Sequence, residues 1–259
     1  MSTQIVERMA VEIDGDGDPV ILLHGLGGTS NSWTPQMSVF AGRFRVIRPD
    51  LPGSGRSPLP SDVLSIDLLA DLVIRTAEKL GIERAHLAGH SMGTIVCQHV
   101  AVRAPKLVRS LALIGVLTAP PDAARKGLKD RAQKVRAEGM SAVADAVVQA
   151  ATSSQSKAGN PVAIAAARES LMRQAPDGYA AHCEALSNAV AADPAAITCP
   201  TLLIAGEDDV VAPPSVARGL ADKLKGARVH VLPRVGHWLT FEAANDVNTL
   251  LKEFLSSVR

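Results

Sequence analysis

Short apolar runs alternate along this chain with stretches that have the spacing of amphipathic helices, and this alternation constrains the fold most. Each run has the length of a strand, and the helical stripe from Ile66 to Leu80 ends at Gly81, a favourable C-terminal cap. Such alternation predicts an α/β fold, in which helices cover both faces of a mostly parallel sheet and ligands bind at the carboxyl ends of its strands. The runs are residues 20–23, 44–47, 85–88, 111–114, 202–205 and 229–232.

The alternation is interrupted between residues 118 and 198, where no strand-like run occurs and Ala, Arg, Lys and Glu dominate. Proline and glycine divide this stretch into about four expected helices, which we interpret as an insertion sitting on the sheet. A chain of 259 residues can form one large α/β domain or two small ones. We assign residues 1–117 and 199–259 to the α/β core and residues 118–198 to the helical insertion.

Composition excludes several classes of protein. Hydrophobic residues make up 47% of the chain and charged residues 20%, as in ordinary globular proteins, and the net charge of +1 provides no basic surplus for nucleic acid. The three cysteines lie far apart and form no zinc-site spacing. The N-terminus does not have the pattern of a signal peptide, and no run of about 18 apolar residues occurs. We therefore expect a cytoplasmic protein that binds neither nucleic acid nor a membrane.

The sharpest chemical signal is Gly89-His90-Ser91-Met92-Gly93, which follows the run 85–88 and precedes a helical stripe. A G-x-S-x-G turn between a strand and a helix holds its serine in a strained conformation, exposed at the helix N-terminus. The pattern also arises by chance, but its flanking elements favour Ser91 as a nucleophile. The neighbouring His90 is expected to point away from the serine.

A serine hydroxyl is a weak nucleophile at neutral pH, so it needs a histidine base and a carboxylate that orients the base. His237 follows the last strand run and precedes the final helix, expected from about Phe241, which places it at the correct edge of the sheet. Three acids, residues 207–209, follow the run 202–205. The pattern G-x-x-D-x-x-x-P favours Asp209 as the orienting acid, with Asp208 as the alternative.

Attack on a carbonyl also requires donors for the oxyanion that forms. The glycine-rich turn after the run 20–23, residues 24–28, can present the backbone N–H of Leu26, and the N–H of Met92 is the second expected donor. A glycine-rich turn can instead bind phosphate, but the residues of a P-loop and the G-x-G-x-x-G spacing are absent. We expect His24 to hold this loop in place, and residues 50–57 to form a tight turn beside the site.

Together, five motifs in this order resemble the α/β-hydrolase superfamily across essentially the whole chain: HGLGG (24–28), DLPGSGRS (50–57), GHSMG (89–93), GEDDVVAPP (206–214) and GHW (236–238). The resemblance implies an eight-stranded sheet, a helical cap inserted after the sixth strand, and a hydrolase that uses no cofactor and no metal. It also implies Ser91 as nucleophile, Asp209 as acid and His237 as base.

Two segments of the cap, residues 137–147 and 175–180, are most similar to the 3-oxoadipate enol-lactonase and carboxylesterase branch. The chain departs from the enol-lactonases at residues 148–150, where they usually carry aromatic residues, at Thr94, where they have a second glycine, and at Trp238, where they have a non-aromatic residue. These departures favour a broader hydrolase of carboxylic esters or lactones. A serine nucleophile argues against haloalkane dehalogenases and epoxide hydrolases.

Three alternatives stay open: a 3-oxoadipate enol-lactonase, a carbon–carbon bond hydrolase or perhydrolase, and a non-catalytic receptor with the hydrolase fold. We expect a small-molecule ester or lactone as the partner of the site, with Gly25, Gly27, His90 and Trp238 lining the substrate pocket. Tyr179 is the one aromatic residue of the cap, so the cap walls should be aliphatic and uncharged esters should be preferred. The cap arginines are interpreted as solvated. A homo-oligomer is compatible with the sequence.

Overall fold

The computed structural model describes residues 2–258, in which eight strands form one sheet. The strand order is β1-β2-β4-β3-β5-β6-β7-β8, with antiparallel pairing of β1 with β2 and of β2 with β4, and parallel pairing elsewhere. The mostly parallel α/β fold is thereby confirmed, and each of the six predicted runs lies in one of the strands β3 to β8. The strands are β1 (Ser2–Val6), β2 (Met9–Asp14), β3 (Asp18–Leu23), β4 (Phe44–Pro49), β5 (Ala85–His90), β6 (Val108–Ile114), β7 (Thr201–Gly206) and β8 (Arg228–Leu232).

Two hydrophobic clusters cover the two faces of the sheet, because successive side chains of a strand point to opposite faces. In β3, Ile21 and Leu23 pack in one cluster while Val20 and Leu22 pack in the other. The first cluster includes side chains of α2 (Ile66–Lys79), α3 (Met92–Arg103) and α9 (Pro214–Ala221). The second includes side chains of η1 (Ser30–Gln36), α1 (Met37–Phe40) and α11 (Ala244–Ser257).

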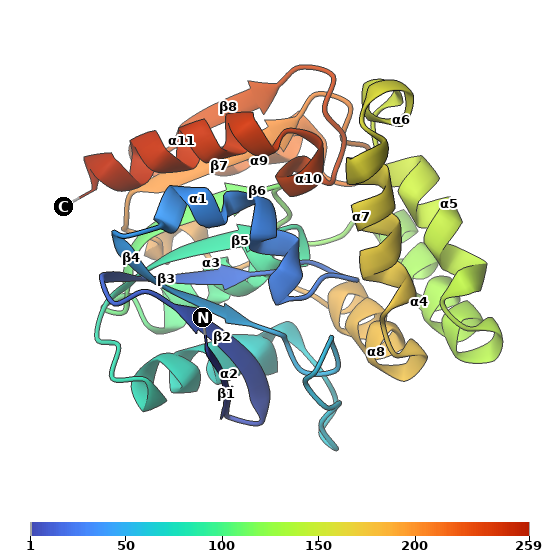
Figure 1. The fold of residues 1–259 in the computed structure, drawn as a ribbon, viewed down its shortest axis with the longest axis horizontal. Coiled ribbons are helices and arrows are strands. Elements are labelled where there is room, and N and C mark those ends of the chain that lie inside the picture. The colour runs from blue at the N-terminus through green and yellow to red at the C-terminus, as the bar shows by residue number, and fades with distance from the viewer. Residues whose placement is uncertain (1, 259) are drawn as a thin grey trace.

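The expected helical insertion follows β6 and lies beyond the arrowheads of the parallel strands in Figure 1, at their carboxyl ends. Within the described chain it holds five α-helices rather than the expected four, namely α4 (Asp122–Glu138), α5 (Ser141–Ala151), α6 (Ser154–Gly159), α7 (Pro161–Met172) and α8 (Pro176–Ser187), followed by η2 (Pro194–Ala196). The additional break separates α5 from α6 without glycine or proline. The hydroxyl of Ser153 accepts the N–H of Ser156 and starts α6 as its N-cap. We refer to this insertion as the cap.

Across residues 2–258, no helix combines the length and the apolar character needed to cross a membrane.

Candidate active site

Ser91 lies in a strained turn between β5 and α3. Its backbone has φ 53° and ψ −121°, a conformation that residues with a side chain rarely adopt. The turn requires glycine on both sides: a Cβ at Gly93 would lie 2.4 Å from the Leu23 carbonyl oxygen, and a Cβ at Gly89 would lie 2.4 Å from that of Gly93. The Thr94 hydroxyl donates to the Ser91 carbonyl at 2.6 Å. The turn is therefore tightly fixed, as the G-x-S-x-G pattern predicts.

The structure brings the three predicted triad residues together at the carboxyl ends of three strands. The Oγ of Ser91, after β5, is 2.8 Å from Nε2 of His237, which follows β8. Nδ1 of His237 is 2.7 Å from Oδ2 of Asp209, which follows β7. All three residues are at least 94% buried. This continuous chain of hydrogen bonds can pass a proton from the serine to the imidazole while the carboxylate orients the ring.

Asp209, rather than Asp208, contacts the histidine. Its second oxygen, Oδ1, accepts the backbone N–H groups of Val211 and Ala212, each at 2.8 Å. Burial raises the pKa of Asp209, but the charge and hydrogen bond of His237 and these two N–H groups outweigh burial and hold the pKa below its ordinary value. Asp209 is therefore ionised at neutral pH. Asp208, by contrast, is exposed to solvent and makes no contact with His237.

His90 supports the loop that carries His237. Its Nε2–H donates to the backbone carbonyl of His237 at 2.7 Å. Burial, followed by the charge of His237, lowers the pKa of His90 to about 3, so the ring is neutral and serves as a donor. The Trp238 ring is 5.9 Å from that of His90 and stacks on Phe241 at 5.8 Å. His90 and Trp238 thus form an aromatic cluster next to the His237 ring, which lies 5.2 Å from that of His90.

The loop after β3 approaches Ser91 closely. A Cβ at Gly25 would lie 2.7 Å from that of Ser91, so this position requires glycine. Gly27, at φ 77°, faces the cap, where a Cβ would meet Leu171 and Tyr179. Within residues 2–258, the backbone N–H groups of Leu26 and Met92 donate to no protein acceptor, so both are available to an oxyanion. We refer to residues 24–28 as the oxyanion loop.

His24 ties the oxyanion loop to β4 and the turn that follows it. The N–H of Leu51 donates to Nε2 of His24 at 2.9 Å, so the proton of the neutral ring is on Nδ1, which donates to the carbonyl of Gly25 at 2.9 Å. Burial lowers the pKa of His24, which keeps the ring neutral. The expected structural role of His24 agrees with these contacts.

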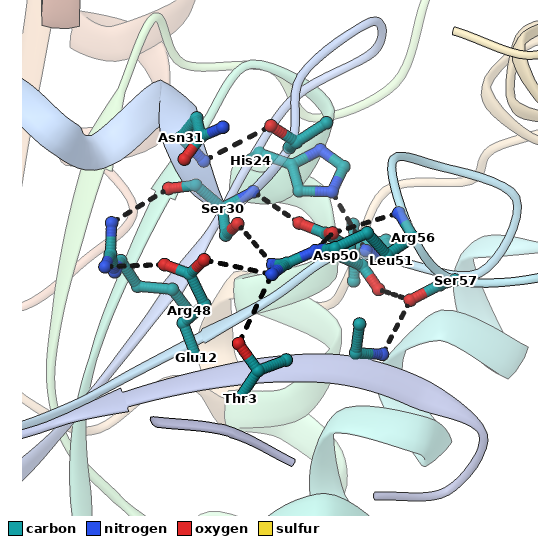
Figure 2. Close-up of polar contacts among 12 residues, drawn as sticks. Thr3, Glu12, His24, Ser30, Asn31, Arg48, Asp50, Leu51, Arg56 and Ser57 are labelled. Atoms are coloured by element: carbon teal, nitrogen blue, oxygen red, sulfur yellow. Dashed lines mark hydrogen bonds and ion pairs between the residues drawn. The ribbon is translucent and has the colours of Figure 1, made fainter. Parts of the chain in front are cut away.

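Figure 2 shows a charged network that holds the chain just after the oxyanion loop. Asp50 accepts the N–H of Ser30 at 2.7 Å and pairs with Nε of Arg56 at 2.9 Å. Arg56 also reaches Glu12 on β2, at 3.1 Å, and Glu12 pairs with Arg48 on β4 at 2.7 Å. The DLPGSGRS motif, residues 50–57, therefore links the loop to the antiparallel edge of the sheet.

The cap also holds the oxyanion loop, through residues that sequence reasoning missed. The Ser170 hydroxyl donates to the Gly27 carbonyl at 2.7 Å, and Nε2 of Gln174 donates to the same carbonyl at 3.1 Å. No local pattern could reveal these contacts, because they join residues more than 140 positions apart. Cap position and loop geometry are therefore coupled.

Comparison with known proteins agrees with this geometry. The family model described as alpha/beta hydrolase fold matches residues 18–244. The chain belongs to the α/β-hydrolase family. This family member is 28% identical to a protein provisionally named carbamate hydrolase RutD from a Caulobacter species, over 99% of this chain and 98% of that protein. The superfamily resemblance of the motifs is thereby confirmed.

Two solved structures of the family are similar over nearly the whole chain. A thermophilic esterase from Thermogutta terrifontis, solved with malate bound, has a TM-score of 0.93 and 25% identity and covers 100% of this chain and 99% of its own. An enol-lactonase from Burkholderia xenovorans LB400 has a TM-score of 0.89 and 28% identity and covers 99% of this chain and 100% of its own. These relatives indicate a hydrolase.

Proposed function

We propose that this protein is a serine hydrolase that cleaves carboxylic esters or lactones through an acyl-enzyme. The observation that carries the proposal is the chain of contacts from Ser91 through His237 to Asp209, at 2.8 and 2.7 Å. Ser91 Oγ attacks the carbonyl carbon as its proton passes to Nε2 of His237, and the N–H groups of Leu26 and Met92 stabilise the oxyanion. The imidazolium then protonates the leaving alkoxide, and a water molecule, activated by His237, hydrolyses the acyl-enzyme.

The cap arginines bear on the charge of the substrate. Four of them have partners elsewhere: Arg125 donates to the carbonyls of Ser187 and Ala189, Arg136 pairs with Glu184, Arg168 with Asp145, and Arg173 with Glu169. A guanidinium that already has a partner is less available to a substrate carboxylate. These contacts support a preference for uncharged esters.

The second candidate is a 3-oxoadipate enol-lactonase, favoured by one cap residue. Half-buried Arg131 on α4 has no carboxylate within ion-pair distance among residues 2–258, and it lies near Tyr179, whose buried hydroxyl has no hydrogen-bond partner among the same residues. The ring of Tyr179 in turn lies against Gly27 of the oxyanion loop. Arg131 is therefore the cap cation to test for binding of a substrate carboxylate.

The decisive experiment combines turnover with labelling of the nucleophile. We expect the purified protein to hydrolyse a fluorogenic butyrate ester, and Ser91→Ala to lose on the order of 10³-fold or more of kcat, because the triad acts as a unit. An organophosphate should add to Ser91 of the wild type, as located by peptide mass spectrometry. An adduct on another residue, or an active alanine variant, would overturn the mechanism.

A further inference from the structure

The carboxylate of Glu242 lies between the loop that carries His237 and the cap. Glu242 ends the short helix α10 (Leu239–Glu242), directly after this loop. Its Oε2 accepts the backbone N–H of Gly236 at 3.1 Å and that of Ser153 in the cap at 2.9 Å. Its Oε1 accepts the N–H of Trp238 at 3.0 Å. One side chain thus holds both residues that flank His237 and connects them to the start of α6.

Both backbone groups of His237 are also hydrogen-bonded. The N–H of His237 itself donates to the carbonyl of Ala151, at the end of α5, at 2.7 Å, and the His237 carbonyl accepts from His90. Since the backbone at residue 237 sets the point from which the imidazole extends, these bonds, together with the contact to Asp209, help to fix where Nε2 lies relative to Ser91.

Gly236 makes this arrangement sterically feasible. A Cβ at this position would lie 2.6 Å from the N of Ser153, 2.9 Å from the carbonyl oxygen of Ala151 and 2.9 Å from Oε1 of Glu242. Any side chain would therefore separate the loop from the cap and from the carboxylate. The glycine before the histidine is needed for this close approach.

We propose that Glu242 is a positioning residue that orients the catalytic base and docks the α5–α6 junction of the cap onto it. The proposal rests on the proposed serine-hydrolase function. It extends that function by joining base and cap in one hydrogen-bonded unit, so that the cap helps to set the geometry of proton transfer.

A carboxylate is suited to this place because it offers two acceptor oxygens to three N–H donors. A glutamine of the same shape has one acceptor oxygen, and its amide NH₂ would face at least one of these donors. Glu242→Gln therefore disturbs the loop with little change in volume. Glu242→Asp keeps the charge but shortens the reach.

Glu207, directly after β7, offers a matched control that contacts the same loop. Its Oε2 accepts one backbone N–H, from Arg234, at 3.0 Å, and its side chain is exposed. Glu207→Gln removes the same charge from a side chain that contacts the segment after β8, but it affects neither the peptide groups around His237 nor the cap.

The test compares kcat, KM and the NMR signal of the His237 Nδ1 proton in the wild type and in all three variants, each verified as folded by circular dichroism. We expect Glu242→Gln to lower kcat on the order of tenfold to a hundredfold with KM within about threefold, because small displacements of reacting groups have effects of this size. The downfield Nδ1–H resonance should shift or broaden, and Glu242→Asp should recover part of kcat. Glu207→Gln should match the wild type within about twofold, as a surface substitution does.

Three results would overturn the proposal: wild-type kcat in Glu242→Gln, equal losses in Glu242→Gln and Glu207→Gln, or a loss of kcat with an unchanged Nδ1–H signal. If Glu242→Gln does not fold, Glu242→Asp decides by the same criteria. Failure of the underlying function looks different, because the wild type itself would then neither hydrolyse the butyrate ester nor react with an organophosphate at Ser91.

Discussion

Replacing Asp209 by asparagine tests the orientation of the base most directly. The two N–H groups that contact Oδ1, from Val211 and Ala212, require an acceptor, so the amide oxygen of the introduced side chain should take this place. The reversed amide would leave two buried donors unpaired, at about 1–3 kcal/mol each. The NH₂ group therefore faces Nδ1 of His237, which must become an acceptor.

The consequence is the wrong tautomer of His237. With Nδ1 unprotonated, the proton of the neutral ring is on Nε2, which then donates to Ser91 and cannot receive the serine proton. Loss of this function in a Ser-His-Asp triad lowers kcat by about 10⁴-fold, equivalent to about 5.4 kcal/mol of transition-state stabilisation.

The assay is kcat on a fluorogenic butyrate ester at pH 8, with Asp208→Asn as the control. Asp208 has an exposed side chain and should tolerate the change within about twofold. If Asp209→Asn kept more than about a tenth of wild-type kcat, or if Asp208→Asn were the more damaging change, the assignment of the orienting acid would be refuted.

Two further predictions concern acid stability and substrate charge. Burial lowers the pKa values of His86, His90 and His182 to about 4, 3 and 4, so the unfolded chain takes up protons below pH 6.5 before the folded one does. The free energy of unfolding should have its full value above pH 6.5 and fall as the pH approaches 4. At pH 5, His182 alone accounts for roughly 2 kcal/mol of this loss. His182→Gln should therefore flatten the pH dependence of the urea midpoint, and a dependence parallel to that of the wild type would contradict this reasoning. For substrate charge, we expect a higher kcat/KM for a neutral butyrate ester than for 3-oxoadipate enol-lactone. Arg131→Gln should change the ratio of these two kcat/KM values by less than about threefold. A hundredfold preference for the lactone, about 2.7 kcal/mol, would instead favour the enol-lactonase.

The central strands were predictable because they are continuous apolar runs buried on both faces. The antiparallel strands β1 and β2 were not, and only the family resemblance implied a sheet of eight. Residues 2–5 of β1 are exposed, and β2 carries Glu12 and Asp14 among its apolar residues, so neither strand has an uninterrupted apolar run. β1 pairs with β2, and β2 pairs with β4, a contact between distant segments that the local sequence does not reveal.

The site was predictable where the chemistry requires a fixed local motif, as around Ser91 and in the loop after β7. The residues that support it were not. Glu242, Ser170 and Gln174 bind backbone groups of distant segments. Because every residue type carries the same backbone groups, the sequence of the partner segment does not reveal such a contact. The final helix likewise divides into α10 and α11, and this division places the Glu242 carboxylate beside the His237 loop.

The backbone of Ser91 has a consequence for how this protein would respond to selection. A residue with a side chain at φ 53° and ψ −121° destabilises the fold by about 1–3 kcal/mol. This is a substantial part of the free energy of unfolding of a typical domain, about 5–15 kcal/mol. Glycine would adopt the same conformation without this steric cost. A library screened for heat resistance alone would therefore be enriched in glycine at this position, and its most stable members would lack the proposed nucleophile.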